Sequence, residues 1–213
     1  MSEYNVIAEW ERKGAVFTDN RYSRGHVWKF DGGVIVPASS SPHNVRIPFS
    51  IPENVDPEEA FVASISSCHL LTFLYLAAKE RYRVDKYVDN AVGIMGKNAT
   101  GVQFIERTIL RPHVIFSGPK QIDEETYRGL HEASHHECFI ANSVLTKIET
   151  QGTWEHLITM TRDHVCDMDV DERTAPATYD YEGDTYYFCS EKCKEKFAAD
   201  PEMYVSRTEA SQT

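Results

Sequence analysis

Two cysteines far apart in the chain, Cys68 and Cys138, have the clearest capacity for chemistry. Cys68 lies inside an apolar segment, residues 56–74, whose spacing is helical, and Cys138 ends a later segment that we also expect to be helical. Two lone thiols on separate helices suit a pair that meets in the fold and cycles through a disulfide. The pattern predicts redox chemistry.

A cysteine that reduces peroxides must react as the thiolate, which requires a nearby positive charge. Cys68 is too far from the start of its helix to gain much from the helix dipole, so a cationic side chain must be supplied. Arg46 is our candidate for this cation, and Glu58 is the candidate for orienting it through a bidentate contact.

Three further cysteines, Cys166, Cys189 and Cys193, gather in the last fifty residues. The spacing of Cys189 and Cys193 places two thiols about one turn apart at the start of a helix, and Cys166 arrives from an upstream loop. Thiolates in this arrangement suit a zinc or copper ion. We expect His164 to be the fourth ligand, while Asp163, Asp167 or water remain alternatives.

The elements that must position these residues are mixed in type. The first fifty residues predict short strands at 6–10, 15–17, 26–30 and 34–36. A long helix then begins with Asp56 as N-cap and Pro57 at its first position, and we expect it to end near Tyr82.

The remaining pattern predicts a hairpin, a second helix and two closing strands. The hairpin strands are 88–95 and 103–115, the helix is 123–138, and the closing strands are 143–150 and 153–159. Because the strands meander without repeated βαβ units, the predicted fold class is α+β. We place a domain boundary between residues 159 and 160, with a small cysteine-rich module at 160–213 that needs a metal or docking to be stable.

Composition excludes several classes of function. The 213 residues are 41% hydrophobic and carry a formal net charge of −11, which disfavours binding to nucleic acid or to an anionic membrane. No apolar run approaches the roughly 20 residues that span a bilayer, and the N-terminus lacks the features of a signal peptide. An odd number of cysteines, five, fits a reducing cytoplasm with reactive or metal-bound thiols.

The combination of these motifs resembles the OsmC/Ohr family of osmotically induced and organic hydroperoxide resistance proteins, in its OsmC-like branch. The resemblance covers roughly residues 1–150 and is carried by residues 57–59, Ala63-Ser64, residues 67–71 and residues 136–143. It implies an intertwined homodimer in which β-sheets wrap two central helices, and thiol-dependent reduction of hydroperoxides, with a preference for organic ones.

The same resemblance implies a role for each residue of the first site. Cys68 would be the peroxidatic cysteine, Cys138 the resolving cysteine, and Arg46 with Glu58 the activating pair. Glu58 lies ten residues before Cys68, about 15 Å along a helix, so we expect a composite site across the dimer interface.

Two features depart from the family pattern. Phe139 stands where the family often has proline after the resolving cysteine. Arg21 and Arg24 compete with Arg46, because the Ohr branch takes its arginine from an N-terminal loop.

The segment from Asp163 to Tyr204 resembles the YHS domain, a small metal-binding module. The matching residues include Cys166, Met168, Cys189 and Cys193, while Asp167 replaces the usual glycine. The resemblance supports a metal site in this module.

We therefore interpret the chain as a cysteine-based peroxidase with an appended metal-binding module. Its partners would be a hydroperoxide and a dithiol or lipoyl-type reductant, and the peroxide step would need no cofactor. The alternative is a metal-binding or thiol-sensing protein that uses the OsmC fold as a dimeric scaffold. A third possibility is a small-molecule binding protein.

Overall fold

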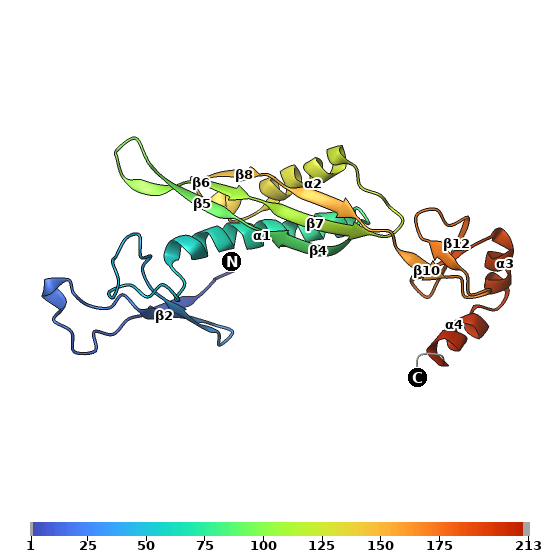
Figure 1. The fold of residues 1–213 in the computed structure, drawn as a ribbon, viewed down its shortest axis with the longest axis horizontal. Helices are drawn as coiled ribbons and strands as arrows, with labels where there is room; N and C mark the ends of the chain where they lie inside the picture. The colour runs from blue at the N-terminus through green and yellow to red at the C-terminus, as the bar shows by residue number, and fades with distance from the viewer. Residues whose placement is uncertain (1, 211–213) are drawn as a thin grey trace. The chain divides into compact units, whose positions relative to one another are not determined.

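The computed structural model describes residues 2–210, which form mixed helix and sheet (Figure 1). This confirms the predicted α+β class. In chain order the elements are β1 (Val6–Glu9), η1 (Phe17–Asp19), β2 (His26–Phe30), β3 (Ile35–Ala38), α1 (Pro57–Lys79), β4 (Arg83–Asp89), β5 (Val92–Lys97), β6 (Gln103–Leu110), β7 (Pro112–Ser117), α2 (Glu124–Glu137), η2 (Ala141–Ser143), β8 (Lys147–Thr150), β9 (Thr153–His156), β10 (Met160–Arg162), β11 (Asp169–Asp171), β12 (Ala177–Tyr181), β13 (Asp184–Phe188), α3 (Glu191–Ala199) and α4 (Pro201–Ala210).

These elements form two compact units, each assembled from separate stretches of the chain. The first unit comprises residues 1–69, 90–110 and 138–151, and the second comprises residues 70–89, 111–137 and 152–213. The first unit therefore contains both Cys68 and Cys138, whereas the second contains the three C-terminal cysteines.

The long helix α1 starts where the sequence predicts and stops slightly earlier. Asp56 caps it by accepting a hydrogen bond from the Glu59 N–H at 2.8 Å, and Glu59 Oε2 accepts from the Asp56 N–H at 3.1 Å. At the other end Arg81 takes a left-handed φ of 61°, and the Tyr82 N–H donates to the Ala77 carbonyl. This terminating motif ends the helix at Lys79 rather than near Tyr82.

The first unit contains two three-stranded sheets. Strands β1, β2 and β3 pair antiparallel in that order. In the other sheet β5 pairs antiparallel with β6, and β6 pairs parallel with β8. The parallel pairing returns the chain from Cys138 to this sheet, which keeps Cys138 in the same unit as Cys68.

The second unit repeats the arrangement of two antiparallel strands and one parallel strand in the sheet β4-β7-β9. Its core is made by the C-terminal half of α1, by β7 and by α2. The buried residues are Phe73, Leu76, Ala77, Val114, Phe116, Ile122, Tyr127 and Leu130. Burial of this apolar surface holds α2 against the sheet, and so fixes the end of the helix that Cys138 follows.

Three of the predicted strands differ in the structure. Residues 17–19 form a single 3₁₀ turn instead of continuing a strand at 15–17. The segments 88–95 and 103–115 each divide into two strands of different sheets, the first at residues 90–91 and the second at Arg111. The Arg111 N–H donates to Asp89 Oδ1 at 2.6 Å, so one hydrogen bond connects the two breaks. The periodicity of apolar residues does not reveal this contact.

Helix α1 is long and apolar enough, by length and composition alone, to cross a membrane. This differs from our expectation that no apolar run approaches the length that spans a bilayer. However, Ile65, His69 and Phe73 are each at most 1% exposed, as expected for a core helix. The apolar character of α1 therefore does not indicate a membrane.

The C-terminal module is built from two short hairpins and two helices. Strands β10 and β11 pair antiparallel, as do β12 and β13. Its small core contains Ala177, Phe188 and Phe197, and the ring of Phe197 contacts those of Tyr179, Tyr186 and Tyr204. The aromatic residues therefore form the core of the module, as their clustering in the sequence suggests.

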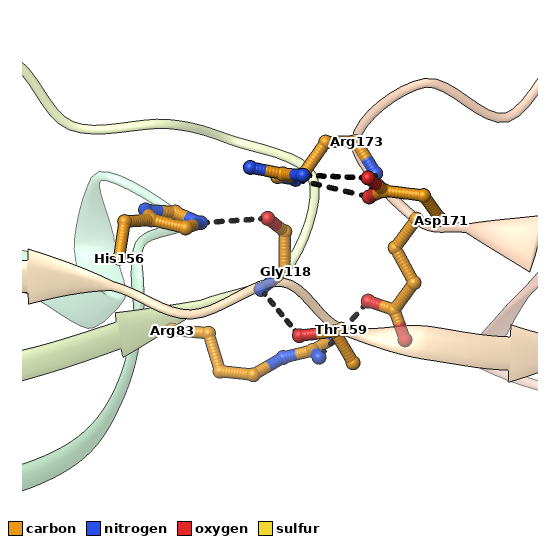
Figure 2. A network of polar contacts seen from close by, with 7 residues as sticks. Arg83, Gly118, His156, Thr159, Asp171 and Arg173 are labelled. Atoms are coloured by element: carbon orange, nitrogen blue, oxygen red, sulfur yellow. Dashed lines mark hydrogen bonds and ion pairs between the residues drawn. The ribbon is translucent and has the colours of Figure 1, made fainter.

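A polar network joins this module to the sheet β4-β7-β9 (Figure 2). The guanidinium of Arg83, at the start of β4, lies 3.0 Å from Glu172 Oε2, and the Glu172 side chain is only 9% exposed. The Gly118 N–H donates to Thr159 Oγ1 at 3.3 Å, and Nε2 of His156 donates to the Gly118 carbonyl at 2.9 Å. Both β4 and the end of β7 thus contact the segment that leads into the module.

Gly118 is required at this junction by its conformation and its neighbours. Its φ is +85°, a value that side chains other than glycine rarely adopt. A Cβ atom there would lie 3.2 Å from Cζ of Arg83. Glycine therefore lets the Arg83 side chain pass close to the backbone on its way to Glu172.

Candidate functional site

The structure brings the two separated cysteines together. Cys68 lies in the fourth turn of α1 and is half-buried, whereas Cys138 directly follows α2 and is fully buried. Their side chains are within hydrogen-bonding reach, and neither forms a disulfide. A pair at this separation can close into a disulfide with a modest movement of one side chain.

The Cys138 thiol is held in its protonated form. Burial is the main cause that raises its pKa to about 11, and the neighbouring Cys68 thiol adds to the effect. The Ala141 N–H points at the Cys138 sulfur from 3.4 Å and opposes the shift. At neutral pH Cys138 is therefore a proton donor and a weak nucleophile.

The backbone around Cys138 is fixed by short-range hydrogen bonds. Its carbonyl accepts from the N–H of Asn142 at 3.1 Å and from the Asn142 side-chain amide at 2.9 Å. The Ser143 hydroxyl donates to the Phe139 carbonyl at 2.7 Å. These contacts build a tight turn after α2 without a proline at residue 139, and they leave the Phe139 side chain 80% exposed.

Glu58 has one partner and one unused oxygen. Its Oε1 accepts a hydrogen bond from the side-chain amide of Asn44 at 2.9 Å. Its Oε2 is buried and has no hydrogen-bond partner. A buried carboxylate oxygen without a donor is costly, which marks this atom as a place where a further donor belongs.

The structure does not bring Arg46 to that oxygen. Arg46 is exposed, and its guanidinium lies 5.7 Å from the ring centre of Phe49, with no ion pair to Glu58 among residues 2–210. Of the competing arginines, Arg24 is bound to the backbone carbonyls of Asn20 and Tyr22, and Arg21 is exposed. Within the described chain, Cys68 and Cys138 meet, while the predicted activating pair does not.

The C-terminal cysteines form a second cluster. The sulfur of Cys166 lies 3.5 Å from that of Cys189, which lies 3.7 Å from that of Cys193. Four thiolates placed tetrahedrally at about 2.3 Å from a zinc ion are about 3.8 Å apart. The three sulfurs are thus already spaced as they would be around one metal ion.

Asp163 completes this cluster, whereas His164 does not join it. One ligand atom from each of Asp163, Cys166, Cys189 and Cys193 lies within 4.8 Å of every other. The ring of His164 instead packs edge-on against Tyr186, with centroids 5.1 Å apart, and near Phe197. Our expectation that His164 is the fourth ligand therefore differs from the structure, because the backbone turn directs the side chain of Asp163 toward the sulfurs.

The position of Asp163 follows from its local hydrogen bonds. Its Oδ1 accepts from the Val165 N–H at 2.9 Å, a turn that aspartate favours, and its Oδ2 accepts from the Cys189 N–H at 2.9 Å. Asp163 is fully buried. The signal available in the sequence was this short acidic side chain three residues before the first cysteine of the module.

The charges in this cluster favour a cation. Burial opposes ionisation of Asp163, but hydrogen bonds from the Cys189 and Val165 N–H groups outweigh it and hold the pKa of Asp163 below its ordinary value. Although Cys166 as a residue is exposed, loss of solvation at its sulfur is the main cause that raises its pKa to about 12, with Cys189 and Asp163 adding to it. Burial also raises the pKa of Cys193. A metal ion would pair with the Asp163 carboxylate and displace the protons of the thiols, so the donor set fits one.

Helix α3 fixes the geometry of the two later cysteines. Ser190 is its N-cap, and the Ser190 hydroxyl accepts a hydrogen bond from the Cys193 N–H. Cys189 precedes the cap and Cys193 lies in the first turn. Three thiolates and a carboxylate from a loop, a strand end and a helix start thus form a site suited to zinc or copper.

Comparison with known proteins agrees with both parts of this description. A family model described as OsmC-like protein matches residues 52–151, and one described as YHS domain matches residues 161–208. An OsmC-like protein of unknown function from Vibrio cholerae is 51% identical, with a TM-score of 0.70, and the match covers 72% of this chain and 100% of that one.

More distant solved structures share the fold. An OsmC-like protein from Mycoplasma pneumoniae is 14% identical with a TM-score of 0.56, covering 73% of this chain and 99% of that one. An organic hydroperoxide resistance protein from Elizabethkingia anophelis is 16% identical with a TM-score of 0.50, again covering 73% and 99%.

The C-terminal module has a relative of another kind. A copper-transporting P-type ATPase from Rhizobium leguminosarum bv. viciae is 44% identical over 45 residues. This match covers 21% of the present chain and only 5% of the ATPase, so the likeness concerns the module alone. The chain belongs to the OsmC-like family and carries a YHS domain at its C-terminal end.

Proposed function

We propose that this protein reduces organic hydroperoxides by a thiol–disulfide cycle, with Cys68 as the peroxidatic cysteine and Cys138 as the resolving cysteine. The contact between the two thiols carries the proposal, since disulfide formation needs that proximity. The resemblance of the fold to organic hydroperoxide resistance proteins is consistent with it.

The cycle balances as follows. The Cys68 thiolate attacks the distal oxygen of a hydroperoxide, the O–O bond breaks, and the alcohol leaves after taking up a proton. Cys68 is then a sulfenic acid. The Cys138 sulfur displaces its hydroxyl as water, and the resulting disulfide is reduced by an external dithiol of the lipoyl type.

The environments of the two sulfurs support these roles. Burial raises the pKa of Cys138 to about 11, so Cys138 keeps its proton until a sulfenic acid forms beside it. Cys68 is the less buried of the two, which leaves it open to a small substrate. The order of attack follows from this difference.

Glu58 and Arg46 would complete the site. The unused, buried Oε2 of Glu58 requires a donor, and a guanidinium is the side chain best shaped to supply one. We propose that Arg46 of a second copy binds there and stabilises the Cys68 thiolate. Glu58 and Cys68 are ten residues apart on α1, which makes a pairing in trans easier to build.

A homodimer is part of the same proposal. Leu71 and Tyr75 lie four residues apart on one face of α1 and are 64% and 62% exposed. Ser67, one turn earlier, is exposed on that face as well. An apolar helical face of this kind in a core helix is expected to be covered by a second copy of the chain.

The C-terminal module would bind one metal ion through Cys166, Cys189, Cys193 and Asp163. The spacing of the sulfurs and the buried carboxylate support this, and the resemblance to part of a copper transporter leaves zinc and copper as the two candidates. A metal held there would tie β13, α3 and the preceding loop together. A thiol-sensing or metal-binding protein on a dimeric scaffold is the second candidate function, favoured by this cluster. A reducing cytoplasm would suit both candidate functions, because it keeps cysteines as thiols.

The test is consumption of cumene hydroperoxide with dihydrolipoamide as reductant, for the wild type, Cys68→Ser and Cys138→Ser. The proposal predicts turnover in the wild type and none with Cys68→Ser. Cys138→Ser should consume about one equivalent and then carry Cys68 as a sulfinic acid, detectable by mass spectrometry. A wild-type rate equal to the reductant blank, together with tight metal binding, would favour the second candidate instead.

A further inference from the structure

The first unit contains a pocket that the thiol chemistry does not use. It has a volume of about 430 Å³, and we call it the aromatic pocket. Its lining residues are Trp10, Phe17, Tyr22, Arg24, His26, Ser40 and Pro57. Pro57 lies eleven residues before Cys68, about 16 Å along α1, so within one chain the pocket is remote from the two thiols.

The walls of the pocket are three aromatic rings in mutual contact. The ring of Phe17 stacks on that of Tyr22 at 4.6 Å, and Trp10 meets Tyr22 edge-on at 5.3 Å. The Trp10 indole N–H is used internally, since it donates to the Ser23 carbonyl at 2.8 Å. Trp10 and Phe17 nevertheless remain 38% and 49% exposed. The ring surfaces that stay exposed are apolar and suit a flat, apolar group.

One positive charge borders these rings without an acidic partner. The Arg24 guanidinium lies 3.9 Å from the Tyr22 ring centre, and it donates to the carbonyls of Asn20 and Tyr22 and to the Asn20 side-chain oxygen. All of these acceptors are neutral, and no carboxylate of residues 2–210 forms an ion pair with Arg24. A guanidinium has five N–H donors, so two remain for a ligand.

Two further polar groups lie at the same pocket. The Ser40 hydroxyl oxygen is buried and has no hydrogen-bond partner. Nδ1 of His26 donates to the Arg24 carbonyl at 2.8 Å, which leaves Nε2 of the neutral ring as an acceptor. A buried hydroxyl without a partner is costly, and a bound ligand would satisfy it.

From these observations we propose that the aromatic pocket binds a small aromatic carboxylate. Its ring would lie against Trp10 and Phe17, and its carboxylate would accept hydrogen bonds from Arg24 and Ser40. The volume falls in the range of small-molecule sites, roughly 300–1,000 Å³, and the combination of apolar walls with a few convergent polar groups is typical of them. The inference uses neither Cys68 nor Cys138, although Arg24 is one of the arginines that compete with Arg46 for the activating role.

The test is a titration with 1-naphthoate, in the Cys68→Ser background so that no redox reaction intervenes. Quenching of tryptophan fluorescence reports contact with Trp10, and calorimetry gives the affinity. Saturable binding of 1-naphthoate is expected, with the neutral analogue 1-naphthalenemethanol binding about tenfold or more weakly because it cannot pair with Arg24. Trp10→Phe should remove most of the quenching while calorimetric binding persists.

Variants distinguish specific recognition of the carboxylate from nonspecific binding. Arg24→Met should weaken 1-naphthoate binding by about tenfold or more, and Ser40→Ala by about threefold to tenfold. Arg21→Met, an exposed arginine three residues away, is the matched control and should change the affinity by less than about twofold. Circular dichroism checks that each variant is folded.

Specific outcomes would overturn the proposal. They are the absence of saturable binding at millimolar ligand, equal affinity for the acid and the alcohol, or an Arg24→Met variant that is folded and binds as well as Arg21→Met. If Arg24→Met does not fold, the preference of the Cys68→Ser parent for the carboxylate over the alcohol decides the matter. Binding is measured in the Cys68→Ser background and turnover in the wild type, so a failure of one is distinguishable from a failure of the other.

Discussion

The two thiol sites of this protein differ less in their sulfurs than in the charges beside them. In both sites burial raises a thiol pKa, to about 11 for Cys138 and about 12 for Cys166. The polar neighbours that act on the Cys138 sulfur are the Cys68 thiol and backbone N–H groups. Beside Cys166 and Cys189 stands a buried, ionised carboxylate, Asp163.

The Asp163 carboxylate favours metal binding over attack on a peroxide at the C-terminal cysteines. A negative group next to a thiol disfavours the thiolate, which slows attack on a peroxide, yet it adds a ligand and attracts a cation. The groups that shift the pKa of Cys138 include no carboxylate. Cysteine content alone would not distinguish the two sites, whereas the neighbouring charge does.

The largest expected effect is a separation of the two activities by single substitutions. Cys68→Ser should lower the rate of hydroperoxide consumption by more than about 1,000-fold, because it removes the attacking atom, and should leave metal affinity unchanged. Cys166→Ser should lower the metal affinity and leave the rate of hydroperoxide consumption unchanged. Peroxide consumption measured beside a metal titration checks this, and loss of both properties in either variant would show that the sites are not separate.

The pH dependence of metal binding should be nearly as large. Metal ions displace protons from thiols whose pKa values lie above neutrality, so affinity must rise with pH and fall as pH decreases. Asp163 has a lowered pKa, is already ionised and contributes no proton. The logarithm of the apparent affinity for Zn²⁺ should therefore rise by up to about three per pH unit between pH 6 and 8. A slope near zero in a competition titration would contradict thiolate ligation.

The fourth ligand should have an intermediate effect. Asp163→Asn keeps the size of the side chain but removes its charge, and we expect a 10- to 100-fold loss of zinc affinity. His164→Phe is the matched control, since its ring packs on Tyr186 and should contribute little to affinity. Visible absorption of the Co²⁺-substituted protein reports the change in ligand set. A larger loss for His164→Phe than for Asp163→Asn would restore histidine as the ligand.

The smallest effect concerns the contact between the module and the sheet. Arg83→Met leaves the Glu172 carboxylate, 9% exposed, without its partner and should cost about 2 kcal/mol in the free energy of unfolding. Glu172→Gln should cost less, because the half-exposed Arg83 can be solvated by water. Denaturant unfolding measures both. The double variant should recover part of the loss, and equal losses in the two single variants would argue against a buried carboxylate at this junction.

Elements whose ends carry strong local sequence signals were predicted correctly. The start of α1 was predictable because Asp56, Pro57 and the acidic first turn are each favoured at helix N-termini. The strand breaks at residues 90–91 and at Arg111 were not, since they depend on which sheet each half joins. Apolar periodicity reports that a residue is buried and not against which partner.

The candidate sites divide in the same way. Residue type, spacing and periodicity are local properties, and they were enough to predict which sulfurs are available, the α+β class, and an OsmC-like part followed by a YHS module. The folded structure was needed to find that Cys138 packs against Cys68, that Asp163 rather than His164 meets the three thiols, and that Glu58 Oε2 lacks a donor. Each of these depends on the direction of a side chain after a turn or across a fold, and that direction is set by hydrogen bonds and packing between residues distant in the chain.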